Sequence, residues 1–582
     1  MSQSSSGRHN GGIAKGLFLG EVRDQALSPF PRINEDEAET LKMVIESIDR
    51  FMGPKESEYK KFDHEGSQPS DYVDELKALG LFSLIIPSEY DGLGLSNSGY
   101  SRVLQQTSRY DASTSLTIGA HSSIGLKALI LFGTEEQKRK YLPKLATGEM
   151  IAAFCLTEAG SGSDAASIKT RAVLNPDGSW TLSGEKIWIT NGGTADFFTV
   201  FAATDTEGGK ITAFIVERSF SGVSSGPKED KMGIRASCTT TVAFDDVKLP
   251  PSTVLGEVGK GFKVAMAVLN NGRTGLGGGC VGAMKRLIEL STAQATQRKQ
   301  FGKSISEFQL IKEKIGVMTT LCFAAESVVS VVGHLIDSEV EDFSVEAAMS
   351  KVFVSEALWT VADEALQIAG GNGFMKDFPY ERVVRDSRIN RIFEGTNEIL
   401  RLFIGLSGMK DAGDELKDVA RSLSGIFNHP IKGFGVLSNY ASRKVSQYTP
   451  IGRQALSNIH PKLGSHAQEI EQSISKLAQA VEQVLRAYGK EVIGKQLVTK
   501  RLADSATDIF VSMCVLSRVS SLIEEKGAEK CEQEISIAAI CVHNAVTRVH
   551  TSLKGVSENR DRELCSVADH VLTNGGYSWD VI

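Results

Sequence analysis

The sequence predicts an α+β protein that is mostly helical, with a small β unit between two helical units and a further helical domain at the end. The hydrophobic period is helical at first, changes to two near residue 151 and returns to helical near residue 259. A chain of 582 residues is too long for one ordinary core. We therefore expect an N-terminal extension, an N-terminal helical domain, a middle β domain, a helix-bundle domain, a basic linker and a C-terminal helical domain, at residues 1–35, 36–150, 151–258, 259–408, 409–468 and 469–582.

Capping signals support the first helical domain. Ser70 is expected to cap a helix from Asp71 to Leu79, and Thr134 with Gln137 forms a capping box. In the middle domain, apolar and polar residues alternate in runs separated by Gly, Asn and Asp turns, beginning at Trp180, Phe197 and Ile211. Long helical segments rich in Ala, Leu, Ile and Val then predict a helix bundle.

The basic linker stands out because residues 419–468 hold six Lys or Arg residues and no Asp or Glu. Interspersed apolar residues suit an anionic membrane surface. A mobile, solvated linker is the alternative interpretation.

Composition excludes several classes of protein. A net charge of -7 argues against nucleic-acid binding. The eight cysteines form no C-x-x-C pair, so we expect reduced thiols and no metal. No uninterrupted apolar run approaches the roughly 18 residues of a spanning helix. Residues 1–10 are Ser-rich and could be a tag, a linker or part of a transit peptide, and the C-terminus is not a peroxisomal S-K-L signal.

Two segments near the middle domain are suited to a flat or phosphorylated ligand. The run from Phe154 to Asp164 crowds small residues and hydroxyls, although a plain Gly-rich turn is the alternative. In the run from Gly184 to Gly193, Trp188 and Thr190 share one face of a strand, where a flat heterocycle could pack. A core tryptophan is the competing interpretation.

Two later segments carry charge. Arg298 to Gly302 joins a basic fork to an aromatic residue, a combination suited to pyrophosphate and adenine, or it is simply exposed. Glu394 lies between Phe393 and Gly395 just before an apolar helix, as a catalytic base or as a helix-capping acid.

Together these segments resemble the acyl-CoA dehydrogenase family from about Leu76 to Ser407. The family's motifs occur in order at Thr157–Asp164, Trp188–Asn191, Arg298–Gly302, Gln367–Gly373 and Phe393–Thr396. Ala159 stands where the family usually has Pro. The extra C-terminal domain is similar to that of the very-long-chain members and of their relative that serves respiratory complex I assembly.

The resemblance implies an FAD-dependent enzyme that converts long or very-long-chain fatty acyl-CoA to trans-2-enoyl-CoA. Glu394 is then the base for the α-proton, with a pKa raised by desolvation. The same resemblance implies the first step of mitochondrial β-oxidation, a homodimer, electron transfer to electron-transfer flavoprotein and peripheral association with the matrix side of the inner membrane. The alternatives are a complex I assembly scaffold that keeps the fold, and an acyl-CoA oxidase.

The resemblance also assigns binding residues. In one subunit it implies FAD contacts from Phe154, Leu156, Thr157, Gly162, Ser163, Trp188, Ile189, Thr190, Thr396, Asn397 and Glu398. Across a subunit interface it implies contacts from Arg298, Phe301, Gln367, Gly370 and Gly371. For the substrate it implies Ser163, Asn270, Arg273 and Gly395. The floor of the acyl pocket is expected near Ile118–His121, where Gly119 and Ala120 leave room for a long chain.

Overall fold

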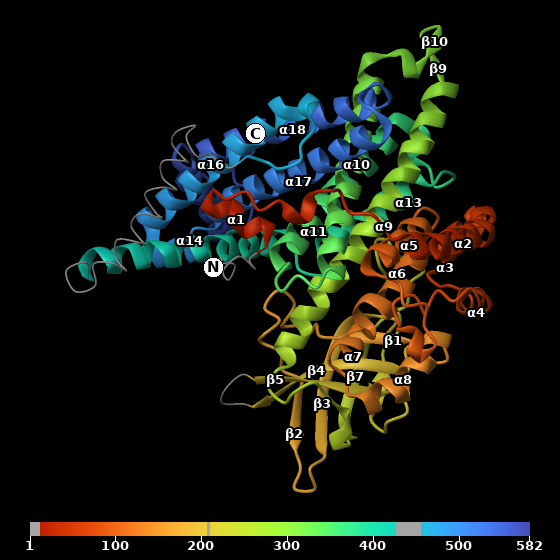
Figure 1. The fold of residues 1–582 in the computed structure, drawn as a ribbon. Coiled ribbons are helices and arrows are strands. Elements are labelled where there is room, and N and C mark those ends of the chain that lie inside the picture. The colour runs from red at the N-terminus through yellow and green to blue at the C-terminus, as the bar shows by residue number, and fades with distance from the viewer. Residues whose placement is uncertain (1–11, 206–209, 426–454, 582) are drawn as a thin grey trace, which may run out of the picture. The chain divides into compact units, whose positions relative to one another are not determined.

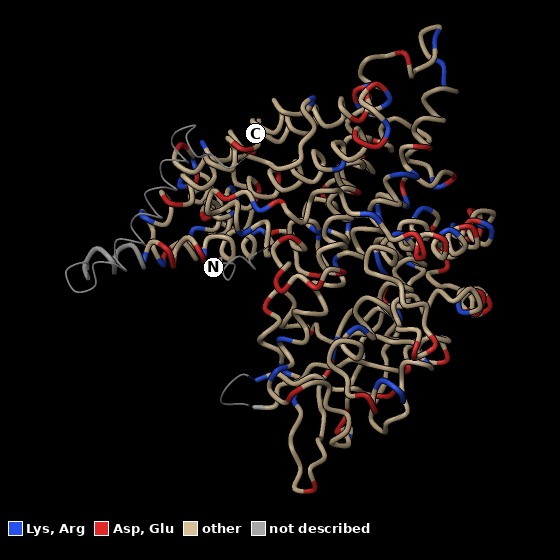
Figure 2. Tube along the Cα trace, viewed as in Figure 1, with Lys and Arg blue, Asp and Glu red and all other residues tan. Residues whose placement is uncertain are grey.

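The computed structural model describes residues 12–205, 210–425 and 455–581, which form two compact units (Figure 1). The central unit is Phe30–Leu400, and the terminal unit combines Met1–Pro29 with Arg401–Ile582. Acidic and basic residues are interspersed along the helices of both units (Figure 2).

The central unit begins with a helical layer. Its helices are α2 (Glu35–Met52), α3 (Glu56–Glu65), α4 (Ser70–Ala78), α5 (Asn97–Ser108), α6 (Ala112–Gly119), the π-helical turn η4 (Ala120–Gly125), α7 (Lys127–Phe132) and α8 (Glu135–Thr147). The capping box of Thr134 and Gln137 is confirmed. The prediction for Ser70 was wrong, because Pro69 precedes α4 in extended conformation and Ser70 is already the first helical residue.

The middle of the central unit is a mixed β-sheet. Its strands are β1 (Ala152–Cys155), β2 (Arg171–Leu174), β3 (Trp180–Thr190), β4 (Phe197–Asp205), β5 (Lys210–Glu217), β6 (Val223–Ser225), β7 (Thr239–Leu249) and β8 (Val254–Leu255). They follow the order β6-β7-β3-β2-β4-β5-β8, with β1 parallel to β4. The strands expected from Trp180, Phe197 and Ile211 are therefore present. β3 changes register between Lys186 and Ile189, which places a bulge at Trp188.

The helix bundle follows the sheet. It contains α9 (Gly261–Gln297), α10 (Gln309–Asp337), α11 (Ser344–Ala369), α12 (Gly371–Phe374) and α13 (Tyr380–Arg388), with the hairpin of β9 (Lys299–Gln300) and β10 (Lys303–Ser304) after α9. Glycines bring α5 and α9 into close contact, because a methyl group on Gly282 would lie 1.9 Å from the Gln105 carbonyl oxygen. Figure 1 shows α9 running from the sheet to the β9–β10 hairpin.

The terminal unit is helical in the part that the structure describes. Its helices are α1 (Ile13–Leu19), α14 (Asn397–Gly425, counted here from Arg401), α16 (Gly464–Tyr488), α17 (Gln496–Lys526), α18 (Glu532–Ser557) and α19 (Asp561–Asn574). α1 packs on α16 and α17, with Leu17 and Phe18 buried. The sequence did not predict that an N-terminal helix would join the C-terminal domain.

Two parts of the chain bear on membrane contact. Part of the basic linker, residues 426–454, lies outside the described residues. Three described helical stretches are long and apolar enough to cross a membrane, namely Ala112–Phe132, Gln309–Asp337 and Gln496–Lys526. The expectation of no such segment was wrong, because Gly, Ser and Thr interrupt the apolar runs without lowering the mean hydropathy enough. Between 56% and 78% of each apolar window is buried inside the protein.

Candidate active site

Glu394 lies in a strained turn between the short 3₁₀ helix η7 (Ile389–Arg391) and the start of α14. Its φ angle is 56°, and that of Gly395 is 89°. A left-handed conformation costs a residue with a side chain about 1–2 kcal/mol, and such strain gathers at functional sites. The turn aims a carboxylate into the protein interior where an ordinary helix start would direct it to solvent.

The carboxylate of Glu394 is backed by α9. A methyl group on Gly272 would lie 3.6 Å from both carboxylate oxygens. The Oε2 atom is buried and accepts no hydrogen bond among the described residues. Burial raises the pKa of Glu394, and the nearby charges of Arg273 and Lys351 oppose that rise. A buried carboxylate of raised pKa is suited to take a proton.

Arg273 and Asn270 lie on α9 beside this turn. Arg273 is 6% exposed, and its Nη1 donates a 2.6 Å hydrogen bond to Asn270 Oδ1. Burial lowers the pKa of Arg273 to about 10, while Glu394 opposes the shift. The structure thus brings three predicted substrate residues, Asn270, Arg273 and Gly395, to the neighbourhood of the carboxylate. The fourth, Ser163, is exposed in the loop that follows β1.

A cavity extends from Glu394 and Phe393 into the helical layer. Gly119 and Ala120 line it, as expected, and so do Gly275 and Gly279 of α9. His121 does not line it. Its ring is fully buried, accepts from the backbone N–H of Ala152 at 3.0 Å and donates from Nε2 to the Phe82 carbonyl oxygen at 3.2 Å, so that it ties the helical layer to β1.

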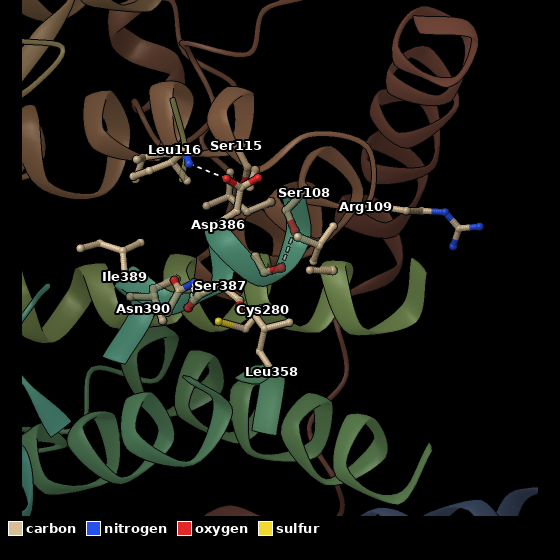
Figure 3. Close-up of a pocket in the computed structure, with 18 of the residues that line it drawn as sticks. Ser108, Arg109, Ser115, Leu116, Cys280, Leu358, Asp386, Ser387, Ile389 and Asn390 are labelled. Atoms are coloured by element: carbon tan, nitrogen blue, oxygen red, sulfur yellow. Dashed lines mark hydrogen bonds between the residues drawn. The ribbon is translucent and has the colours of Figure 1, made fainter. Parts of the chain in front are cut away.

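Polar residues also line the cavity. Figure 3 shows Cys280 and Leu358 beside Ser387 and Asn390, with Ser115 and Asp386 across from them and Arg109 pointing away. Arg109 pairs with Glu289 at 2.6 Å. The cavity is therefore lined by small residues and also by charged ones, among them Glu56, Arg382 and Asp386.

A second feature lies on the sheet, where two predicted cofactor segments meet. The backbone N–H of Ile187 donates to the carbonyl oxygen of Thr157 at 2.9 Å. Trp188 has a φ angle of 56°, and its side chain is 64% exposed. Side chains added at Gly160 or Gly162 would contact nothing within 4 Å. An exposed aromatic residue held in a strained bulge beside an open loop fits a flat ring system.

The remaining residues of this segment flank the ring platform. Phe154, Leu156 and Ile189 are buried at the ends of β1 and β3, Thr157 and Thr190 are half-buried, and Gly162 and Ser163 are exposed. Beneath them, Lys186 is fully buried, and its Nζ lies 2.7 Å from Glu158 Oε1 and 3.0 Å from the Leu156 carbonyl oxygen. This ion pair fixes the loop from below.

The structure does not bring the third predicted set to this platform within one chain. Arg298, Gln367, Gly370 and Gly371 are exposed, and Phe301 is 93% exposed on the β9–β10 hairpin. Figure 1 shows the hairpin at the end of α9 opposite to the sheet. The hairpin, with Phe301, therefore lies away from the sheet within one chain.

Asn397 differs from its predicted role. Its side chain is 1% exposed and accepts a 2.9 Å hydrogen bond from Lys351 Nζ. Its amide also donates to Ser355 Oγ and Glu356 Oε1, both at 3.0 Å. The side chain is occupied inside the protein and is not free for a cofactor, whereas Thr396 is half-buried and Glu398 is exposed.

Sequence reasoning missed Lys351. It is fully buried on α11, and its Nζ also donates to the Gly395 carbonyl oxygen at 2.7 Å. Burial lowers its pKa to about 8, and Glu394 opposes the shift. The signal was a lone lysine in the apolar run Ala347–Leu358, since lysine is almost never fully buried without a partner.

Family models match almost the whole described chain. The N-terminal, middle and C-terminal domains of acyl-CoA dehydrogenase match residues 34–149, 153–247 and 259–408. The model "ACAD9/ACADV, C-terminal domain" matches residues 461–577. The chain belongs to the acyl-CoA dehydrogenase family, as its motifs predicted.

Individual proteins and solved structures of this family are similar to the chain over most of its length. The human mitochondrial very long-chain specific acyl-CoA dehydrogenase is 45% identical over 580 residues, covering 97% of this chain and 88% of the relative. A probable acyl-CoA dehydrogenase of Bacillus subtilis is 39% identical over 82% of this chain and 80% of the relative. An acyl-CoA dehydrogenase of Bacillus anthracis, solved in complex with FAD, is 31% identical with a TM-score of 0.79 over 97% of this chain and 96% of that structure.

Proposed function

We propose that this protein is an FAD-dependent dehydrogenase that removes two hydrogens from the Cα–Cβ bond of long or very-long-chain fatty acyl-CoA. The observation that carries the proposal is Glu394, which lines a cavity and has a raised pKa, and whose Oε2 is buried and accepts no hydrogen bond from the described residues. The product is trans-2-enoyl-CoA.

Glu394 takes the α-proton while the β-hydrogen leaves as a hydride, and the two electrons of the Cα–H bond form the new double bond. FAD, when bound beside Trp188, supplies the acceptor for that hydride. The α-proton of an acyl-CoA thioester is too weakly acidic for a free carboxylate in water to remove it. Exclusion of water by the acyl chain and the cations Arg273 and Lys351 help the developing enolate to form.

The fit of the residues supports FAD. Trp188 offers a flat exposed ring, the Gly160–Gly162 loop is open, and the hydroxyls of Thr157, Ser163 and Thr190 lie on the same segments. The ring centroids of Phe301 and Phe308 lie 6.1 Å apart, and Lys303 is on the same hairpin as Phe301. These residues suit the adenine and pyrophosphate of an FAD that is bound mainly by a second copy of the chain. This arrangement supports a proposed homodimer in which two chains share each FAD site.

The cellular setting is proposed from the relatives. Mitochondrial very-long-chain relatives at 43–45% identity support a role in fatty-acid β-oxidation with electron-transfer flavoprotein as the acceptor. Peripheral docking on an anionic inner membrane is proposed from the composition of residues 419–468. A complex I assembly scaffold remains the alternative, and the intact Glu394 site favours catalysis over it.

Anaerobic titration with acyl-CoA of 4 to about 22 carbons tests the proposal through the flavin absorption band near roughly 450 nm. We expect bleaching that is strongest for long chains. A yellow protein that no acyl-CoA bleaches would instead support the scaffold, and strong peroxide formation in air would support an oxidase.

A further inference from the structure

The turn that carries Glu394 is held in place by one buried lysine. Lys351 Nζ donates to the Gly395 carbonyl oxygen at 2.7 Å and to Asn397 Oδ1 at 2.9 Å. These two acceptors lie one and three residues after Glu394. They restrain the C-terminal side of the left-handed pair Glu394 and Gly395, whose strain needs such external restraint.

Further hydrogen bonds hold Asn397, one of the two groups that accept from Lys351. The Asn397 amide donates to Ser355 Oγ and to Glu356 Oε1, both on α11. Glu356 also pairs with Arg391 of η7 at 2.8 Å, so α11 holds the chain on both sides of Glu394. Lys351 is the member of this network that contacts the turn itself and carries a charge.

We propose that Lys351 is a positioning residue for the dehydrogenation, which holds the Glu394 turn and places a cation beside its carboxylate. The inference rests on the proposed function. A buried lysine usually pairs with a carboxylate, whereas the Lys351 ammonium donates a hydrogen bond to the backbone carbonyl of Gly395, next to the base. Its charge then acts on Glu394 through the low-dielectric interior.

Several titratable groups of the described residues lie around Glu394. Arg273 on α9 and Lys351 on α11 are cationic, and Glu356 is engaged by Arg391 and Asn397. Burial raises the pKa of Tyr100 on α5 and raises that of Cys280 on α9 to about 12, so both stay neutral at working pH. Two buried cations thus face one carboxylate, and when Glu394 is neutralised by the α-proton their field falls on the new enolate.

The test compares wild type with Lys351→Met, measured as FAD-loaded enzyme. We expect kcat to fall by about 10- to 100-fold, because small displacements of a base are costly. KM should stay within about threefold, since the acyl-CoA contacts remain. The acidic limb of the pH profile should move upward by about one pH unit, because an opposite charge has been removed from Glu394.

Lys127→Met is the matched control. Lys127 is another buried lysine, 8% exposed on α7, with its Nζ 3.4 Å from Asn97 Oδ1. It does not line the cavity and should leave kcat and the acidic limb unchanged, although it loses comparable stability. A merely structural role for Lys351 predicts the same outcome in both variants.

Each result decides the proposal. A folded, FAD-loaded Lys351→Met enzyme with the kcat and acidic limb of wild type would overturn it. If that variant does not retain FAD, Ser355→Ala, which removes one hydrogen bond from Asn397, decides in its place: a kcat about 3- to 10-fold lower supports the proposal, and an unchanged kcat overturns it. Failure of the wild type to oxidise any acyl-CoA would overturn the proposed function instead.

Discussion

The backbone N–H of Ile187 donates a 2.9 Å hydrogen bond to the carbonyl oxygen of Thr157, and this bond sets the exposed ring of Trp188 beside the Gly-rich loop. The two segments are 30 residues apart in sequence. Their junction explains why one residue of β3 leaves the regular ladder and adopts φ 56°. The strain is local to the place where a flat cofactor would pack.

Replacing Trp188 by Gly separates strain from binding. The variant loses a stacking surface, so we expect FAD to bind about 10- to 100-fold more weakly. The apoprotein should be no less stable than wild type, because Gly adopts positive φ without cost. Fluorescence titration of FAD and thermal unfolding of apoprotein measure the two effects. Trp180→Ala is the control: Trp180 is 6% exposed against Phe214, and its loss should cost about 3–5 kcal/mol of folding stability. Unchanged FAD affinity in Trp188→Gly would contradict the stacking role.

Mixed dimers test whether two chains share each FAD site. Trp188→Gly and Phe301→Ala should each bind little FAD as homodimers, because every site has one damaged half. A heterodimer of the two variants should regain one intact site, and hence up to half of the wild-type FAD content. Absorbance of affinity-purified, doubly tagged heterodimer measures this. No recovery above the two homodimers would mean that the hairpin does not complete a partner's site.

Gly279→Leu should shorten the acyl cavity. Gly279 lines it, and an added Cβ would fit without a clash, in ordinary van der Waals contact with Ser115 Oγ at 3.8 Å. A leucine side chain would fill the path of a long chain. We expect kcat/KM to fall at least tenfold for palmitoyl-CoA and to change little for a short acyl-CoA. Gly316→Leu on α10, which also has open space, should leave the chain-length profile unchanged. Equal losses at all chain lengths in Gly279→Leu would contradict the assignment of the cavity.

The pH profile follows from the Glu394 environment. Burial raises its pKa above the ordinary value of 4.5, and only the ionised form accepts a proton. Activity should therefore fall as the pH drops through that raised value, at a pH above 4.5. Steady-state kcat/KM over pH 4 to 9 measures the limb, after stability at each pH has been checked. A rate that is flat down to pH 4.5 would contradict the account.

Much of the fold could be predicted from local pattern. The change of period marks the β unit because alternation and helical spacing bury different faces, and the five motifs marked the site because their order carries information that no single motif has. Glu394 and Trp188, both at positive φ in the structure, belong to these motifs, whereas the expectation that Gly119 and Ala120 line the pocket came from the family resemblance.

Other features depended on packing between distant segments. Lys351 is 43 residues before Glu394, and no local rule states which carbonyl a buried ammonium meets. The inward hydrogen bonds of Asn397 and the burial of α1 in the terminal unit have the same cause. The prediction that Ser70 caps α4 was wrong because the preceding proline is already the extended residue before the helix.

The most direct test of the central claim is the visible spectrum of FAD-loaded wild type and Glu394→Gln, recorded before and after anaerobic addition of palmitoyl-CoA. The glutamine keeps the shape of the side chain and removes the base, so general-base catalysis worth about 10²- to 10⁴-fold should be lost. We predict rapid bleaching of the flavin band in wild type and a variant that binds FAD and palmitoyl-CoA but stays yellow. Bleaching at equal rates in both proteins would contradict the role of Glu394.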